Sequence, residues 1–420
     1  MEAVTARPDQ RRRVLPNGLA YALAAGVIGL GLFASLTPSP LYRTYSVLWD
    51  FSPLTLTLIY ATYAFGVLAT LLLAGGISDD VGRRPVLLAS LGGLMGSTLL
   101  FALAQSAAWL FVARGLQGLA TGAAVSAASA TLLDLRRRDP AGVGLTNAAA
   151  SAAGIGLGML VSSSLVQIGW EPRVLPFVVL FGLLGVAFAG AYWMPEPVVE
   201  RSRPKLKIER PRVPAPVRGP FVLASLAVLS SWSIGALFFS LGPELSLDLF
   251  DTTNAIVSGA GIVTLAAAGA VAQLLTARIP PWIAASAGSI ALAAGMVMIV
   301  IAASTDSGTF FLAGSIVGGA GFGAAFLGGL RALVAAIPPQ QRAAVTSAFY
   351  VIAYASLSVP AVLAGVAVTY ISLDSTFEIF GAIVAAIALV VAFQAWRTRP
   401  ERTASLPRLQ GKEVLGDAAS

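Results

Sequence analysis

The sequence predicts an all-α integral membrane protein in which twelve transmembrane helices form two six-helix halves. Apolar residues make up 57% of the chain and charged residues 11%, whereas soluble domains carry roughly 25% charged residues. The apolar runs are long enough to cross ~30 Å of hydrocarbon at ~1.5 Å per residue. Because these runs do not alternate between apolar and polar residues, helices are favoured over barrel strands.

Twelve apolar runs define the expected helices. They cover residues 17–37, 54–74, 86–106, 108–133, 143–168, 174–194, 219–241, 254–277, 282–303, 309–336, 343–370 and 376–396. The domain plan is therefore an N-terminal tail (1–16), an N-terminal half (17–194), a linker (195–218), a C-terminal half (219–396) and a C-terminal tail (397–420). The first run is longer than the core of a signal peptide, so we expect it to stay as a helix.

The two halves resemble a repeat. The linker region PEPVVERSRPKLKIERPRVPAPVRGP (195–220) is rich in Pro and basic residues, which is typical of a semi-extended segment on an anionic inner leaflet. At an offset of 200, FVARGLQGLATGAA (111–124) aligns with FLAGSIVGGAGFGA (311–324). Two parallel six-helix repeats are the plan of a transporter that binds its substrate near the midplane between the halves.

The charge distribution predicts the orientation. If the N-terminus is cytoplasmic, all but three of the 27 Lys and Arg lie on the cytoplasmic side; Arg43 and Arg173 lie outside and Arg114 within a span. By the positive-inside rule, both termini are then cytoplasmic. The net charge of +7 is thus a sign of topology, and we expect no nucleic-acid partner. The chain lacks Cys and His, so proton transfer would use carboxylates, Tyr, Arg or water.

The loop between the second and third spans carries a charged motif. In GGISDDVGRRPVLL, Gly75, Asp79, Gly82, Arg83 and Arg84 follow a fixed order. This motif resembles the signature loop of the major facilitator superfamily, and the resemblance extends over the whole helical region. The family usually has a basic residue directly after the Asp, where this chain has another Asp.

The resemblance implies a latch at the cytoplasmic face. A Gly at the end of helix two permits close approach by helix eleven, which begins near Arg342. Asp79 would accept hydrogen bonds from the free N–H groups at the start of that helix, and Arg83 or Arg84 would reach Asp134. The alternative is that the arginines only set topology and Asp79 only caps a helix. The latch would comprise Gly75, Asp79, Gly82, Arg83, Arg84 and Asp134.

A second motif lies in helix four. RGLQG places Arg114, Gln117 and Gly118 in a pattern that resembles the Arg-x-x-Gln-Gly element of the family. A cation at this depth is expensive unless it is paired or faces water, so we expect Arg114 to face the central cavity. It would lower the pKa of a carboxylate or bind an anionic substrate group. The alternative is an outward-snorkelling side chain.

Helix five carries a partial third match. Gly154 and Gly158 stand where antiporters of the family have glycines, but the Pro and the final glycines of that pattern are replaced. The small-residue face predicts tight helix packing. It gives no further support to an antiporter.

Two stretches predict side chains near the outer mouth. In SLTPSPLYRTYSVLWDFSP (35–53), Tyr42 and Arg43 follow two prolines. They line the mouth if helix one continues, and lie in an interfacial loop if it does not. In SLGPELSLDLFD, Glu244 ends helix seven. It would meet Arg43 or Arg114 and take up a proton, or else belong to a solvated acidic rim.

Helix eleven offers a candidate substrate surface. Tyr350 and Tyr354 are four residues apart and therefore share one helix face. Tyrosines in this arrangement suit the recognition of an organic ligand, although aromatic core packing explains them equally well.

We therefore expect a secondary active transporter in a bacterial inner membrane, not an enzyme, that exports small amphipathic or drug-like compounds. The family implies use of the proton gradient. No phosphate-binding loop is visible, and we expect no cofactor, no metal, a monomer, and partners limited to the substrate and the bilayer. The alternatives are proton-coupled uptake or sugar efflux of a small organic solute and, in another class, a non-transporting receptor or scaffold.

Overall fold

The computed structural model describes residues 14–74, 76–198, 212–338 and 341–398. Within these ranges every regular element is a helix, and twelve helices are long and apolar enough to cross a membrane. The predicted fold class is confirmed. Most of both tails, Gly75 and most of the expected linker lie outside the described residues.

The long helices have the following bounds. The N-terminal half contains α1 (Asn17–Leu36), α3 (Pro53–Ala74), α5 (Arg83–Ala102), α6 (Ala107–Leu135), α7 (Pro140–Ile168) and α8 (Leu175–Tyr192). The C-terminal half contains α9 (Arg218–Ser240), α11 (Ala255–Thr276), α12 (Pro281–Ser304), α13 (Gly308–Ala336), α14 (Arg342–Tyr370) and α15 (Leu373–Arg397). Short helices are η1 (Ser39–Leu41), α2 (Tyr42–Trp49), α4 (Ile77–Val81), η2 (Ala215–Val217) and α10 (Gly242–Leu249).

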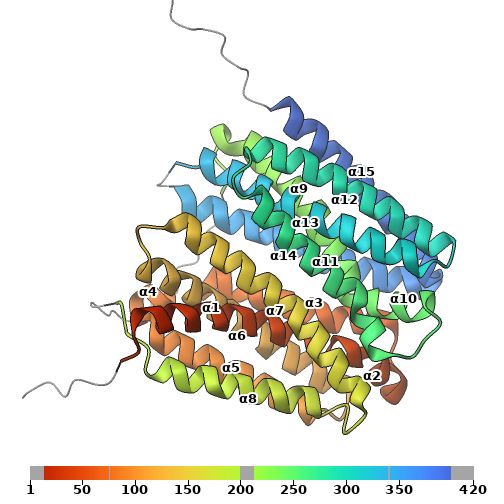
Figure 1. Ribbon diagram of the computed structural model, residues 1–420, viewed down its shortest axis with the longest axis horizontal. Coiled ribbons are helices and arrows are strands. Elements are labelled where there is room, and N and C mark those ends of the chain that lie inside the picture. Colours follow the sequence, from red (N-terminus) through yellow and green to blue (C-terminus); the bar gives the residue numbers. More distant parts are fainter. Residues whose placement is uncertain (1–13, 75, 199–211, 339–340, 399–420) are drawn as a thin grey trace, which may run out of the picture.

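The two halves lie side by side as separate bundles (Figure 1). Along the seam, α7 packs beside α11 and α3 packs beside α14. Two ends of the molecule can be named from the helices that lie there. The end with α4 is called the Arg83 end, and the end with α2 and α10 is called the Arg43 end.

Helix one continues past its prolines, which decides between the two readings of residues 35–53. Pro38 and Pro40 have no N–H to donate within an α-helix. The chain therefore tightens into a 3₁₀ turn, with Leu41 N donating to Pro38 O at 3.1 Å, and resumes as α2. Helix seven repeats this plan, because α9 ends at Ser240 and α10 follows. The predicted span 219–241 therefore omits α10.

Glycines set the closest helix contacts in the N-terminal half. A Cβ at Gly154 of α7 would lie 2.2 Å from the carbonyl oxygen of Gly29 in α1, and one at Gly158 would lie 2.7 Å from Phe33. A Cβ at Gly118 would lie 2.2 Å from the carbonyl oxygen of Tyr63. The small-residue face of helix five, α7, therefore lies against α1. In lipid, association depends on such close contact, because apolar surface alone does not distinguish a helix from the surrounding acyl chains.

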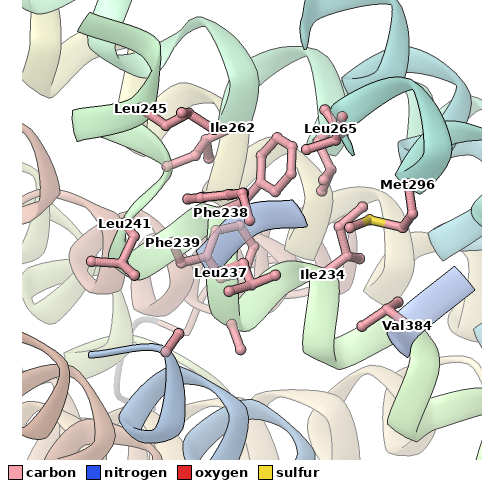
Figure 2. Close-up of a cluster of buried hydrophobic side chains, with 14 of the residues drawn as sticks. Ile234, Leu237, Phe238, Phe239, Leu241, Leu245, Ile262, Leu265, Met296 and Val384 are labelled. Atoms are coloured by element: carbon pink, nitrogen blue, oxygen red, sulfur yellow. The ribbon is translucent and has the colours of Figure 1, made fainter. Parts of the chain in front are cut away.

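The largest buried cluster belongs mainly to the C-terminal half (Figure 2). Phe238 of α9 stacks on Phe311 of α13 with ring centroids 5.6 Å apart. Tyr60 and Met159 of the N-terminal half are also part of this cluster. The cluster therefore crosses the seam and joins the two halves.

Candidate functional site

Arg114 is fully buried inside the N-terminal half. Its Nε donates to the Tyr42 hydroxyl at 2.6 Å, and its Nη1 donates to Ser35 O at 2.8 Å and to Gln117 Oε1 at 2.7 Å. Gln117 in turn donates to Ala34 O at 2.9 Å. That carbonyl is available because Pro38, four residues on, has no N–H to offer it. The break in helix one and the Arg-x-x-Gln motif therefore complement each other.

The charge of Arg114 is balanced mainly by rings and carbonyls. Its guanidinium carbon lies 5.4 Å from the ring centroid of Tyr42, 5.6 Å from that of Tyr63 and 5.7 Å from that of Phe101. These are cation–π distances. Its described contacts include no carboxylate, and Nη2 has no hydrogen-bond partner. Since a buried cation without a counter-charge is costly, this site favours the approach of a negative charge.

Arg114 therefore differs from the expectation that it faces an open cavity. It neither snorkels nor lines an opening, because the α1–α2 break and the aromatic rings of α3 and α5 enclose it. The three hydrogen bonds that the Arg114 guanidinium donates stabilise this enclosed position more than a single contact with water would.

The Arg43 end holds a second polar group of residues, contributed by both halves. Arg43 of α2 and Asp248 of α10 are 3.8 Å apart, and both side chains are half exposed. A cavity of about 20 Å³ lies beside them. Its polar lining comprises Ser39, Tyr42, Arg43, Ser240, Glu244 and Ser258. An exposed pair of this kind contributes little energy, so it can form and break readily.

Glu244 lies in this cavity and is influenced by Arg43, not by Arg114. Burial raises the pKa of the Glu244 carboxyl, the nearby Asp248 raises it further, and Arg43 opposes both effects. Tyr42 lines the same cavity while its hydroxyl accepts the hydrogen bond from Arg114. Tyr42 therefore connects the buried cation to the cavity that Glu244 lines.

Further contacts close the seam at the Arg43 end. Gln167, in the last turn of α7, accepts a hydrogen bond at Oε1 from the backbone N–H of Ala255, which begins α11, at 2.8 Å. The second helix pair of the seam, α3 and α14, also approaches closely. A Cβ at Gly365 of α14 would lie 2.0 Å from the hydroxyl of Thr57 in α3. Toward the Arg83 end, a cavity of about 300 Å³ separates α7 from α11. The pair α7 and α11 is therefore in contact at the Arg43 end and separated by a cavity toward the Arg83 end.

The signature loop forms a charge network within the N-terminal half. Arg83 places Nε 3.0 Å from Asp134 Oδ2 and donates from Nη1 to Ser78 at 2.7 Å. It also pairs with Asp79. Gly82 has φ 113°, a conformation that favours glycine and turns the chain from α4 into α5. Of the two arginines considered, Arg83 makes the contact to Asp134.

Arg84 does not contact Asp134 in the described part of the chain, and the expected contact of Asp79 with the start of α14 is not tested. The Arg84 guanidinium lies 5.0 Å from the ring centroid of Tyr192. The start of α14 is only partly described, since residues 339–340 and the side chains of Arg342 and Ala343 lie outside the described part. The contact of Asp79 with that helix start stays a prediction.

Glu196 is a site residue that the sequence reasoning missed. Its carboxylate accepts from the backbone N–H of Arg83 at 2.9 Å and of Arg84 at 3.0 Å. It thereby satisfies two free donors at the start of α5 and complements the helix dipole. Glu196 follows α8, at the beginning of the expected linker, and a separation of more than 100 residues conceals this contact in the sequence. An acidic residue just after helix six, facing the basic loop, was the available signal.

Tyr350 and Tyr354 belong to an aromatic group on the C-terminal side of the seam. The ring of Tyr354 meets Trp232 of α9 edge to face at 5.3 Å, and Tyr350 lies 6.5 Å from Tyr354. Trp232 also contacts Phe326 of α13. Both tyrosines are half buried, and Tyr354 packs against the cluster that contains Tyr60. Trp232 and Phe326 were not singled out from the sequence, because an isolated aromatic in an apolar span has no distinctive pattern.

Comparison with known proteins identifies similar sequences and folds. A sequence profile of the Major Facilitator Superfamily matches residues 17–358. Multidrug resistance protein D of Escherichia coli (strain K12) is 33% identical over 129 residues, which cover 29% of this chain and 31% of that protein. The match thus spans about a third of the relative's length.

Two solved structures share the fold. The human organic anion transporter MFSD10 (TETRAN) superposes with a TM-score of 0.64 at 15% identity, over 91% of this chain and 100% of that one. A bacterial homolog of the human lysosomal transporter Spinster, in an inward-facing and unoccupied conformation, superposes with a TM-score of 0.70 at 15% identity, over 93% of this chain and 98% of that one.

Proposed function

Because this chain belongs to the major facilitator superfamily and is a multi-pass membrane transporter rather than an enzyme, we propose that it exports amphipathic or drug-like organic compounds in exchange for protons. The observation that carries this proposal is the aromatic group at the seam, formed by Trp232, Tyr350 and Tyr354. Flat apolar faces with hydroxyl edges suit varied organic molecules. The partial similarity to a multidrug resistance protein favours the same substrate class.

Proton coupling is proposed to run through the Arg43 end. Adjacent residues of α2 connect two sites, since Tyr42 accepts from Arg114 while Arg43 reaches Asp248 of the other half. Breaking the Arg43–Asp248 pair would move α2 and draw Tyr42 away from Arg114. The uncompensated cation would then favour a carboxylate or an anionic substrate group nearby. Protonation of Glu244 would bias this equilibrium.

The proposed orientation in the membrane and the proposed conformational state follow from the same arrangement of helices and charges. We place the Arg83 end and both termini in the cytoplasm of a bacterial cell, because basic residues gather there. Because α7 and α11 meet at the Arg43 end and part toward the Arg83 end, we propose an inward-facing state; the Spinster homolog of similar fold is itself inward-facing. The Arg83–Asp134 network would stabilise the opposite state once Asp79 reaches α14. A monomer in the bilayer, without cofactor, suffices for this cycle.

Transport in inverted membrane vesicles tests the proposal. With an imposed proton gradient, inside acidic, a panel of amphipathic dyes and drugs should accumulate inside wild-type vesicles, and collapse of the gradient should release them. Accumulation of a sugar or another polar solute instead, or uptake that needs right-side-out vesicles, would favour the alternative transporters. Asp79→Asn should slow transport; full activity of this variant in a ligand-response assay without any transport would identify a receptor.

A further inference from the structure

The parted seam between α7 and α11 contains a cavity that the proposed function does not use. It measures about 300 Å³, at the lower end of the ~300–1,000 Å³ typical of small-molecule pockets. Its lining is Ala148, Ala149, Ala152, Ala153, Gly156, Leu157 and Leu160 of α7 with Val263, Ala266, Ala267, Ala270, Gln273 and Leu274 of α11. We call it the seam groove. Both helices lie on the near face of the molecule in Figure 1.

The seam groove opens toward lipid and spans one leaflet. Several lining side chains are exposed, among them Leu157 at 53% and Leu274 at 48%. From Ala148 to Leu160, α7 rises roughly 18 Å at 1.5 Å per residue, slightly more than half of the ~30 Å hydrocarbon core. On the side of the Arg43 end the groove closes, because a Cβ at Gly259 of α11 would lie 2.8 Å from the hydroxyl of Ser163 in α7. The groove is therefore a blind, one-sided slot.

The lip of the seam groove at the Arg83 end is polar and basic. Gln273 is the polar member of the lining, one turn before α11 ends. Arg278 follows that helix and Arg138 precedes α7, and both are exposed. Asp134 is paired with Arg83, and Asp139, which caps α7 through the backbone N–H of Gly142, offsets only one of the two arginines. The rim is therefore net positive, directly beside an apolar slot.

We propose that the seam groove binds the tail of a single-chain anionic amphiphile, such as a free fatty acid dissolved in the cytoplasmic leaflet, with its head group at Gln273 and Arg278. The tail would be buried among small side chains that leave room for one chain between two helices. The basic rim supplies the charge complementarity for a carboxylate head group. The proposal rests on the transport function above only in assuming that the Arg83 end is cytoplasmic.

Photolabelling tests this site without any need for transport. Full-length protein would be reconstituted in phosphatidylethanolamine–phosphatidylglycerol vesicles with a photoactivatable lauric acid, and labelled peptides would be mapped. Labels should concentrate in residues 148–160 and 263–274. Ala152→Phe and Ala270→Phe should each reduce this labelling by roughly tenfold, because a ring in the slot removes the burial of several methylenes. Ala386→Phe, an exposed alanine of α15, is the matched control and should leave it unchanged.

The head-group part of the proposal is tested separately. Arg278→Gln should weaken labelling by the fatty acid, whereas labelling by a photoactivatable laurylamine should not fall, because its ammonium head group loses a repulsive neighbour. This variant also keeps the test decisive if a phenylalanine variant does not fold. Equal labelling by the amine or by a photoactivatable phosphatidylglycerol, labels spread over all lipid-facing helices, or full labelling of a folded Ala152→Phe protein would each overturn the proposal. Intact labelling without gradient-driven export would instead contradict the proposed function alone.

Discussion

In the N-terminal half, α6 buries the guanidinium of Arg114, whereas the corresponding helix of the C-terminal half, α13, buries the hydroxyl of Ser315. The helices begin at Ala107 and Gly308, an offset of 201. At this offset Gly118, which packs on α3, corresponds to Gly319, which packs on α11. The sequence alignment at an offset of 200 is therefore displaced by one residue in this helix pair. Ser315 bonds only within its own helix among the contacts described, to Phe311 O at 2.7 Å.

The helix pairs beside these positions also differ, because one pair is in backbone contact and the other meets through aromatic rings. In the N-terminal half, α1 and α7 touch backbone to backbone at Gly29 and Gly154. In the C-terminal half, α9 and α14 are separated by the rings of Trp232 and Tyr354. Directional hydrogen bonds and glycine contacts specify one arrangement, whereas aromatic surfaces tolerate several. The α1–α7 pair is thus suited to coupling, and the α9–α14 pair to the recognition of varied ligands.

The largest expected effect is at Arg114. Arg114→Met should abolish gradient-driven transport and destabilise the protein by about 3 kcal/mol, since three hydrogen bonds of ~1 kcal/mol each disappear. Ser315→Ala, the counterpart in the other half, should change stability by about 1 kcal/mol at most and retain transport. Vesicle transport and thermal unfolding in detergent measure both. Gradient-driven accumulation by Arg114→Met at the wild-type rate would remove Arg114 from the coupling mechanism.

Gly154→Leu should destabilise the N-terminal half by about 1–3 kcal/mol, because the new side chain would have to push α1 away from α7. Gly144→Leu is the matched control, since it lies on the same helix and a Cβ there meets no atom within 4 Å. Thermal unfolding in detergent compares the two variants. Equal unfolding temperatures would show that the α1–α7 contact is not tight.

Tyr354→Ala should raise the KM for an aromatic substrate several-fold. The substrate would lose an edge-to-face contact with the Tyr354 ring, which is worth about 1 kcal/mol. The control is Tyr370→Ala, because Tyr370 lies on the same helix and is 83% exposed. This variant should leave the KM unchanged. Initial rates of dye accumulation give both values. An unchanged KM in Tyr354→Ala would indicate that the aromatic group only packs the C-terminal half.

Glu244→Gln should alter the pH dependence of stability. A pKa raised in the folded protein means that Glu244 binds more protons in the folded than in the unfolded state, so its contribution to stability falls as pH rises above about 4.3. The variant should be slightly more stable than wild type at pH 7 and equal to it at about pH 4. Asp306→Asn, an exposed loop residue, is the control. Parallel pH profiles for Glu244→Gln and wild type would contradict a titrating role for Glu244.

Much of the site could be named from the sequence, but its geometry could not. Arg114, Gln117, Tyr42 and Glu244 stand out because polar groups are rare in apolar spans. Their partners could not be predicted in the same way. Arg114 was expected at an open cavity, and the contact of Glu196 with the start of α5 was missed. In both cases the contacting residues are far apart in the chain. The seam groove has no sequence signal, since alanines on a helix face are typical of packed helices.

By itself, the sequence determined the class of the molecule: twelve helices, two halves, and the charged loop between helices two and three. These properties depend on run length, composition and local motifs, which the hydrocarbon thickness and the backbone's need for hydrogen bonds convert directly into helices. The tertiary structure alone decided which carbonyls receive Arg114, which end of the seam is closed, and that α7 and α11 part around a lipid-facing groove. Helices of similar apolarity can pair in many ways in lipid, and only close contact at particular glycines, rings and ion pairs selects one.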